Sequence, residues 1–100
     1  MNKQILQSFR TQFEAGYDEI MKRFPTSRVS LDYSEFTGAF TQLQDKIVES
    51  LMVKYKMNRE EHYPVGGLGL KMETIFKAAT STVLTEYMAK FNQKCDELKE

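Results

Sequence analysis

The stretch QILQSFRTQFEAGYDEIMKRFP, residues 4–25, carries the pattern on which the expected fold rests. Its apolar side chains recur every three or four residues, a spacing that places them along one side of an α-helix. They are Ile5, Leu6, Phe9, Phe13, Tyr17, Ile20 and Phe24. Because Pro25 cannot continue a helix and disfavours helical backbone at the residue before it, we predict a first helix over residues 2–24.

A second helix is predicted over residues 32–57. Asp32 can accept hydrogen bonds from the free amides of the first turn, and Glu35 stands where it can reach back, as in a capping box. The apolar positions cover a wide arc, which suits the middle helix of a bundle because that helix contacts a neighbour on each side. They are Phe36, Phe40, Leu43, Ile47, Leu51 and Tyr55, with Val48 and Met52 beside them.

A third helix is predicted over residues 70–98. Its β-branched residues Thr80, Thr82, Val83 and Thr85 lower helix propensity, so a bend or break in that run stays open. Three amphipathic segments with short connections indicate an antiparallel three-helix bundle. We therefore expect one all-α domain over residues 1–100, with a glycine-rich loop between the second and third helices.

One alternative to a purely helical chain concerns the stretch RVSLDY, residues 28–33, in which apolar and polar residues alternate as in a strand. It could pair with residues 62–66 in a short two-stranded ribbon. Since an isolated two-stranded ribbon is marginally stable in water, the bundle without it is the main expectation.

Composition narrows the class of protein. With 41% hydrophobic and 28% charged residues the chain is too apolar for a disordered protein, and it lacks the run of about 18 apolar residues that a membrane span requires. Polar residues interrupt the amino-terminal segment, so no secretory signal is indicated and we expect a cytoplasmic protein without a membrane partner. The formal net charge of zero leaves room for nucleic-acid binding only through a local basic patch.

The stretch EEHYPVGGLGLKME, residues 60–73, invites a test for a phosphate-binding loop, because glycines can bring backbone amides together around an anion. The pattern stops after Gly67 and Gly69 without a third glycine, and neither Ser nor Thr follows Lys71 to hold magnesium. We predict that the glycines serve to turn the chain into the third helix.

The same stretch holds the only histidine, His62, next to Glu60 and Glu61. Without a second histidine, and with Cys95 as the only cysteine, an intrachain zinc site is not expected. A Cys–His pair is not expected either, since a helix rising about 1.5 Å per residue would carry Cys95 roughly 35 Å from His62. We therefore expect no metal, no cofactor, no small-molecule substrate and no enzymatic activity.

Gly16 lies among the apolar residues of the first helix and admits two interpretations. It can be a notch that lets a neighbouring helix approach closely, or a slot for the side chain of a partner.

Methionine and aromatic residues are abundant, and both types are enriched where proteins bind partners. They can equally complete a small core. Our leading hypothesis is a non-enzymatic helical protein–protein interaction module, acting as an adaptor, inhibitor or chaperone-like subunit, that binds a partner or forms a homo-oligomer through apolar surface of the second and third helices. The candidate interface residues are Val48, Met52, Tyr63, Leu68, Leu70, Leu84 and Met88.

The alternative hypothesis is a small regulator that contacts nucleic acid through a basic patch at one end of the bundle. Its candidate residues are Lys54, Lys56, Arg59 and Lys71. Lysines at the carboxyl end of a helix also complement the helix dipole, so these residues can have a purely structural role.

Overall fold

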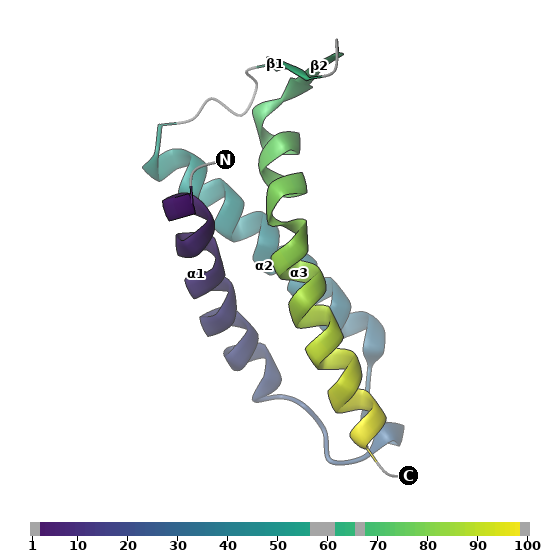
Figure 1. Ribbon diagram of the computed structural model, residues 1–100. Coiled ribbons are helices and arrows are strands. Elements are labelled where there is room, and N and C mark those ends of the chain that lie inside the picture. Colours follow the sequence, from purple (N-terminus) through teal and green to yellow (C-terminus); the bar gives the residue numbers. More distant parts are fainter. Residues whose placement is uncertain (1–2, 57–61, 66–67, 99–100) are drawn as a thin grey trace.

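The computed structural model describes residues 3–56, 62–65 and 68–98, of which residues 62–65 and 68–73 are described by their backbone alone. Within these residues each of the three helices contacts the other two, which confirms the predicted three-helix bundle (Figure 1). The elements in chain order are α1 (Lys3–Met21), the 3-10 turn η1 (Arg28–Ser30), α2 (Tyr33–Lys54), the strands β1 (His62–Val65) and β2 (Leu68–Lys71), and α3 (Met72–Glu97).

Successive helices run in opposite directions along an elongated molecule of 50 × 26 × 19 Å (Figure 1). On α1 and α2 the stacked rings of Tyr17 and Phe40 lie 5.4 Å apart, and further along the chain Phe24 meets Phe36. The radius of gyration is 15.8 Å, whereas a compact chain of this length has a value of about 13 Å. The bundle is therefore long and thin, with a large share of its side chains close to the surface.

Helix α1 ends at Met21, three residues before the predicted end. The amides of Lys22, Arg23 and Phe24 bond to carbonyls three residues back, so the last turn tightens before Pro25. Phe24 leaves the helix, and its ring packs edge-on against two aromatic rings of the core.

The start of α2 follows the predicted cap. Asp32 is the N-cap, and its Oδ1 accepts a hydrogen bond of 3.0 Å from the amide of Glu35. The Glu35 carboxylate lies 3.6 Å from Arg23, so it bridges to the end of α1. At the other end α2 stops at Lys54 instead of residue 57, because Lys56 adopts a positive φ of 55° that ends the helical path.

The alternative in which residues 28–33 pair with residues 62–66 is wrong. Arg28–Ser30 forms a 3-10 turn, capped by Ser27, and its backbone groups bond within the turn. Strand β1 pairs instead with β2, antiparallel, from His62 opposite Lys71 to Val65 opposite Leu68. This partner is nearby in sequence, so closing the hairpin costs less entropy, and the Gly-Gly pair between the strands is a composition typical of a two-residue hairpin turn.

Helix α3 is continuous through Thr80–Thr85 and spans Met72–Glu97, slightly shorter than the predicted 70–98. Thr80 is fully buried in the middle of this run, and its hydroxyl lies 3.0 Å from the carbonyl oxygen of Phe76. The β-branched side chain is therefore satisfied within the helix, and packing overrides its low propensity.

Aromatic rings from all three helices fill the core. Phe9 and Phe13 stack along α1, and Tyr87 of α3 packs between Phe13 and Tyr17 with ring centroids 5.0 to 5.3 Å away. The buried apolar cluster consists of Ile5, Phe9, Phe13, Tyr17, Phe36, Phe40, Ile47, Val48, Leu51, Met52, Phe76, Val83, Tyr87, Phe91 and Cys95.

Gly16 is a notch for Leu43. A Cβ atom at Gly16 would stand 2.5 Å from Leu43 Cδ1 and 2.6 Å from Leu43 Cδ2, far inside van der Waals contact. The chain thus occupies this space itself, which confirms the interpretation as a packing notch. Gly38, in contrast, faces open space.

Two buried polar side chains link α2 to α3 within this core. The Gln44 amide nitrogen donates to the Thr80 hydroxyl oxygen at 3.1 Å and lies 3.3 Å from the carbonyl oxygen of Lys77. Thr80 in turn lies within hydrogen-bond distance of the Phe76 and Lys77 carbonyls. The pair is fully satisfied, so its burial leaves no described polar side-chain atom unpaired.

We predict that Gly16→Leu lowers the free energy of unfolding by about 1–3 kcal/mol, because the added side chain overlaps Leu43. Gly38→Ala should raise it by about 1 kcal/mol, because the added methyl group meets nothing and alanine favours helix. Urea denaturation followed by circular dichroism measures both. Adding Leu43→Ala to Gly16→Leu should recover part of the loss; an unchanged Gly16→Leu protein would contradict the notch.

We also predict that Thr80→Val lowers the free energy of unfolding by about 1–2 kcal/mol, because it removes the acceptor of the buried Gln44 amide. The double variant Gln44→Leu/Thr80→Val should regain most of this loss, since neither side chain then carries an unpaired polar group. Denaturation of the single and double variants gives the coupling energy. Additive losses would show that the two side chains do not depend on each other.

Candidate functional site

Two of the predicted interface residues belong to the core. Val48 and Met52 are only 2% and 3% exposed, which corrects their assignment to an available surface. The physical reason is that α1 and α3 both pack against α2, so its wide apolar arc is covered within the chain. Leu84 and Met88 of α3 are half-buried and pack against the same core.

The other three predicted interface residues lie in the hairpin. Tyr63 is in β1, and Leu68 and Leu70 are in β2, but their side chains fall outside the described part of the chain. Figure 1 shows this hairpin at the amino-terminal end of α3, beyond the start of α1. A role for these three residues in binding stays a prediction.

The predicted basic patch is described in part. Lys54 and Lys56 are exposed at the carboxyl end of α2, whereas Arg59 and the side chain of Lys71 lie outside the described residues. Lys54 Nζ lies 5.7 Å from the ring centroid of Tyr55, a cation–π arrangement within one turn.

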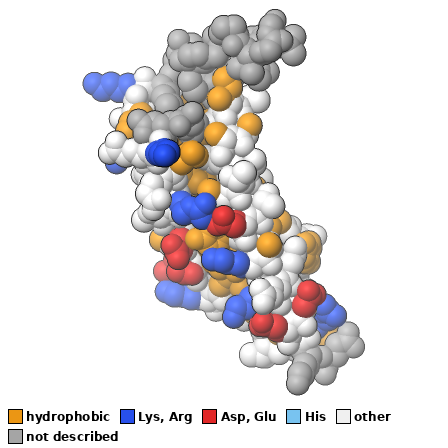
Figure 2. Space-filling view, in the orientation of Figure 1, with side chains coloured by type: hydrophobic (Ala, Val, Ile, Leu, Met, Phe, Trp, Pro, Cys, Tyr) orange, Lys and Arg blue, Asp and Glu red, His pale blue; other side chains and the backbone are white. Residues whose placement is uncertain are grey.

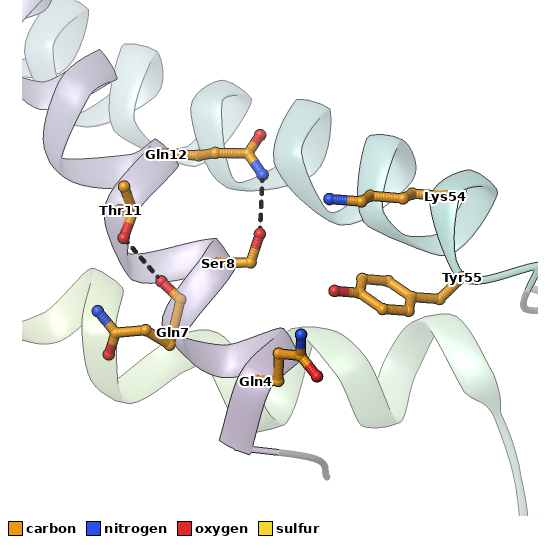
Figure 3. A pocket seen from close by; sticks show the side chains of 7 residues that line it. All are labelled: Gln4, Gln7, Ser8, Thr11, Gln12, Lys54 and Tyr55. Carbon is orange, nitrogen blue, oxygen red and sulfur yellow. Dashed lines mark hydrogen bonds between the residues drawn. The ribbon is translucent and has the colours of Figure 1, made fainter.

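A hollow of about 420 Å³, lined by residues that mostly carry amide or hydroxyl groups, lies where the start of α1 meets the end of α2 (Figure 3). Figure 3 shows Ser8 and Gln12 facing α2, with Lys54 and Tyr55 opposite them. The Gln12 amide donates to the Ser8 hydroxyl at 3.4 Å, so the α1 side presents amide and hydroxyl groups held along the helix. The lining residues are Gln4, Gln7, Ser8, Thr11, Gln12, Lys54 and Tyr55.

A second hollow of about 300 Å³ lies further along the same pair of helices. Its half-buried lining residues have apolar side chains or none, and its exposed ones are charged or polar. The half-buried residues are Gly16, Ile20, Ala39 and Leu43, and the exposed residues are Glu19, Arg23, Gln42 and Lys46. The hollow therefore has an apolar floor and a polar rim, which is how a protein interface is usually divided.

One row of residues on each helix joins the two hollows. On α1 the row steps by three or four residues, which is the spacing of neighbours on one helix face. It consists of Gln4, Ser8, Gln12, Gly16 and Glu19, and Arg23 continues it in the turn just after α1. On α2 the same spacing connects Ala39, Gln42, Lys46, Ser50 and Lys54. Because the two helices run in opposite directions, the rows lie side by side along one seam, which we call the α1–α2 seam.

The sequence patterns did not predict the α1–α2 seam. The signal that could have found it is the repeat of small and amide residues at Gln4, Ser8, Gln12 and Gly16, beside the apolar stripe of α1. The sequence predicted for Gly16 a packing notch or a slot for a partner's side chain, and in both interpretations Gly16 stood alone, without the row that passes through it.

The α1–α3 side is different, because an ion pair crosses it. Arg10 of α1 bonds to both carboxylate oxygens of Glu86 on α3. The hydrogen bonds from Arg10 lower the pKa of the Glu86 carboxyl below its usual value. Figure 2 shows acidic and basic side chains next to each other along the middle and lower parts of this face. A smaller hollow of about 280 Å³ lies beside the pair.

Among the described residues no group of three His, Cys, Asp or Glu residues could hold a metal ion. Cys95 is buried in the core, and this burial raises the pKa of its thiol, which disfavours the reactive thiolate. Within the same residues no helix has the length and apolar character required to cross a membrane.

Comparison with known proteins gives no relative: no family model, no curated protein and no solved structure matches the chain.

We predict that Cys95 reacts slowly with a thiol reagent such as DTNB in the native protein. A thiol whose pKa is raised by burial is mostly protonated below its ordinary pKa, and its sulfur is covered, so reaction waits for unfolding. The rate should approach that of a free thiol in denaturing urea, which serves as the control. Rapid and complete labelling of the folded protein near neutral pH would contradict this result.

Proposed function

We propose that this chain is a non-enzymatic protein–protein interaction module, an adaptor, inhibitor or chaperone-like subunit, that receives a helix of a partner or of a second copy along the α1–α2 seam. The observation that carries the proposal is the pair of matching rows, which open two hollows in line along one pair of helices. A groove between two helices is a common receptor for a third helix.

Two features of the seam support a helix as the occupant. The ring contacts and the ion pair that join α1 to α3 come from Arg10, Phe13 and Tyr17, positions outside the α1 row. A helix laid in the seam would therefore not compete with α3. Ala39 is small, so the backbone of an incoming helix can approach closely there. The space beside Gly16 is filled by Leu43, which also lines the hollow.

Leu84 and Met88, two of the interface residues predicted from the sequence, pack against the core, so a substitution there would alter stability as well as binding. Ala39 lines the seam and does not belong to the buried apolar cluster or to the hydrophobic residues packed against it, so it gives a cleaner test.

We predict that Ala39→Glu abolishes capture of a protein partner from a native lysate of the source cell, because it places a charged side chain in the apolar hollow. Ala89→Glu, the same substitution at an exposed position of α3, should leave capture unchanged. Affinity capture with mass spectrometry measures this, and circular dichroism confirms that both variants are folded. Light scattering across concentrations reports self-association, which Ala39→Glu should likewise weaken.

A strictly monomeric protein that captures nothing from the lysate would contradict the proposed function. Capture that survives Ala39→Glu but is lost with a substitution on α3 would keep the function and move the surface away from the seam.

The second candidate is a nucleic-acid-contacting regulator, favoured by the exposure of Lys54 and Lys56 at one end of the bundle. If it is correct, RNA or DNA binding at low salt should weaken steeply as salt rises. Reversing the charges of Lys54, Lys56, Arg59 and Lys71 together should abolish it. Absence of binding at low salt in a fluorescence anisotropy titration would remove this candidate.

A further inference from the structure

We infer that the helix received by the α1–α2 seam is acidic on the side that faces α2, with two carboxylates about two helical turns apart. This inference rests on the proposed function and adds the chemistry of the partner. It follows from the charges of the seam, which are uneven.

Three cations and one anion line the two hollows: Arg23, Lys46 and Lys54 against Glu19. Glu19 is held by Lys22 at 3.0 Å, and Arg23 lies 3.6 Å from the Glu35 carboxylate, so both of these charges are already balanced and the two lysines of α2 remain. The remaining acids of the middle of α1, Glu14 and Asp18, each follow a residue of the α1 row by two positions, so the helical period of about 3.6 residues places them on the other side of that helix. The seam as a whole favours a partner of negative charge.

Lys46 and Lys54 are the two cations of α2 in this set, and in the described part of the chain neither forms an ion pair. Both are exposed, and they lie in one row on the same helix face. Eight residues separate them, which at about 1.5 Å per residue is roughly 12 Å. Carboxylates seven or eight residues apart on a partner helix match this distance.

The second hollow, with its apolar floor, can receive an apolar side chain of the partner helix. Its position then fixes the spacing between that side chain and the two carboxylates. Its floor is formed around Ala39 and Leu43, which lie about two turns and about one turn from Lys46 on the side away from Lys54. The partner helix then carries an apolar side chain, a carboxylate about one to two turns on, and a second carboxylate about two turns further. Neutral polar groups suit the far end of the partner helix, which meets the amide and hydroxyl groups that line the hollow between the start of α1 and the end of α2.

The length of the seam is also defined. From Gln4 to Arg23 the α1 row extends roughly 28 Å at about 1.5 Å per residue, which a single helix of about 18 to 20 residues covers.

The inference is tested with two fluorescein-labelled helical peptides of identical composition. One carries Leu, Glu and Glu at the spacing above on one face, and the other has both Glu residues moved to the opposite face. We expect the first to bind the full-length protein about three- to tenfold more tightly at low salt, since two exposed charge pairs contribute that range. The preference should shrink as salt rises.

Variants of the protein locate the effect. Lys46→Glu and Lys54→Glu should each reduce the preference by about two- to threefold, whereas Lys94→Glu, an exposed charge reversal on α3, should leave it unchanged. Amide chemical shifts on binding should change at Gly16, Gln42 and Lys46.

Equal binding of the two peptides, a preference that Lys46→Glu does not affect, shift changes confined to α3, or no saturable binding of either peptide would each overturn the inference. Loss of capture with Ala39→Glu, measured separately, would still support the proposed function. The proposed function and the inference of an acidic partner helix can therefore fail independently.

Discussion

The ring of Phe91 on α3 is the contact on which the lower end of the bundle depends. It stacks on Phe36 at 5.2 Å, meets Phe40 at 5.3 Å and Tyr33 at 5.4 Å, and receives the edge of Phe24 at 6.1 Å. One fully buried side chain thus joins α3, α2 and the connection that leaves α1. Aromatic pairs of this kind add stability beyond the area they bury. Because this cluster fixes the crossing of the helices, it also fixes how the two rows of the α1–α2 seam face each other.

The periodicity of apolar residues was sufficient to predict the three helices, because each buries one stripe against the others. The ends were less predictable. Helix α2 stops early because Lys56 takes a left-handed conformation, which sequence patterns associate with glycine instead. The hairpin was missed although Val65-Gly66-Gly67-Leu68 is a recognised two-residue turn signal, because the glycines were interpreted as a turn that leads into the third helix.

The candidate site was less predictable than the fold for a physical reason. A wide apolar arc does not reveal whether neighbours in the same chain cover it, and Val48 and Met52 were assigned to a surface that α1 and α3 fill. Conversely, the α1–α2 seam consists of small, amide and charged residues, none of which is distinctive alone. The site exists because two rows from separate helices meet, and that meeting depends on helix direction and crossing, which the pattern of one helix does not contain.

The bond between Gln44 and Thr80 has a further consequence for how α3 sits on α2. If only apolar rings joined α2 and α3, the two helices could slide along each other, since one ring can replace another after a shift of one turn, about 5.4 Å. Such a shift would separate the Gln44 amide from both its acceptors, the Thr80 hydroxyl and the Lys77 carbonyl, and leave a buried donor unpaired. The polar pair therefore selects a single longitudinal register out of several that the aromatic core alone would accept.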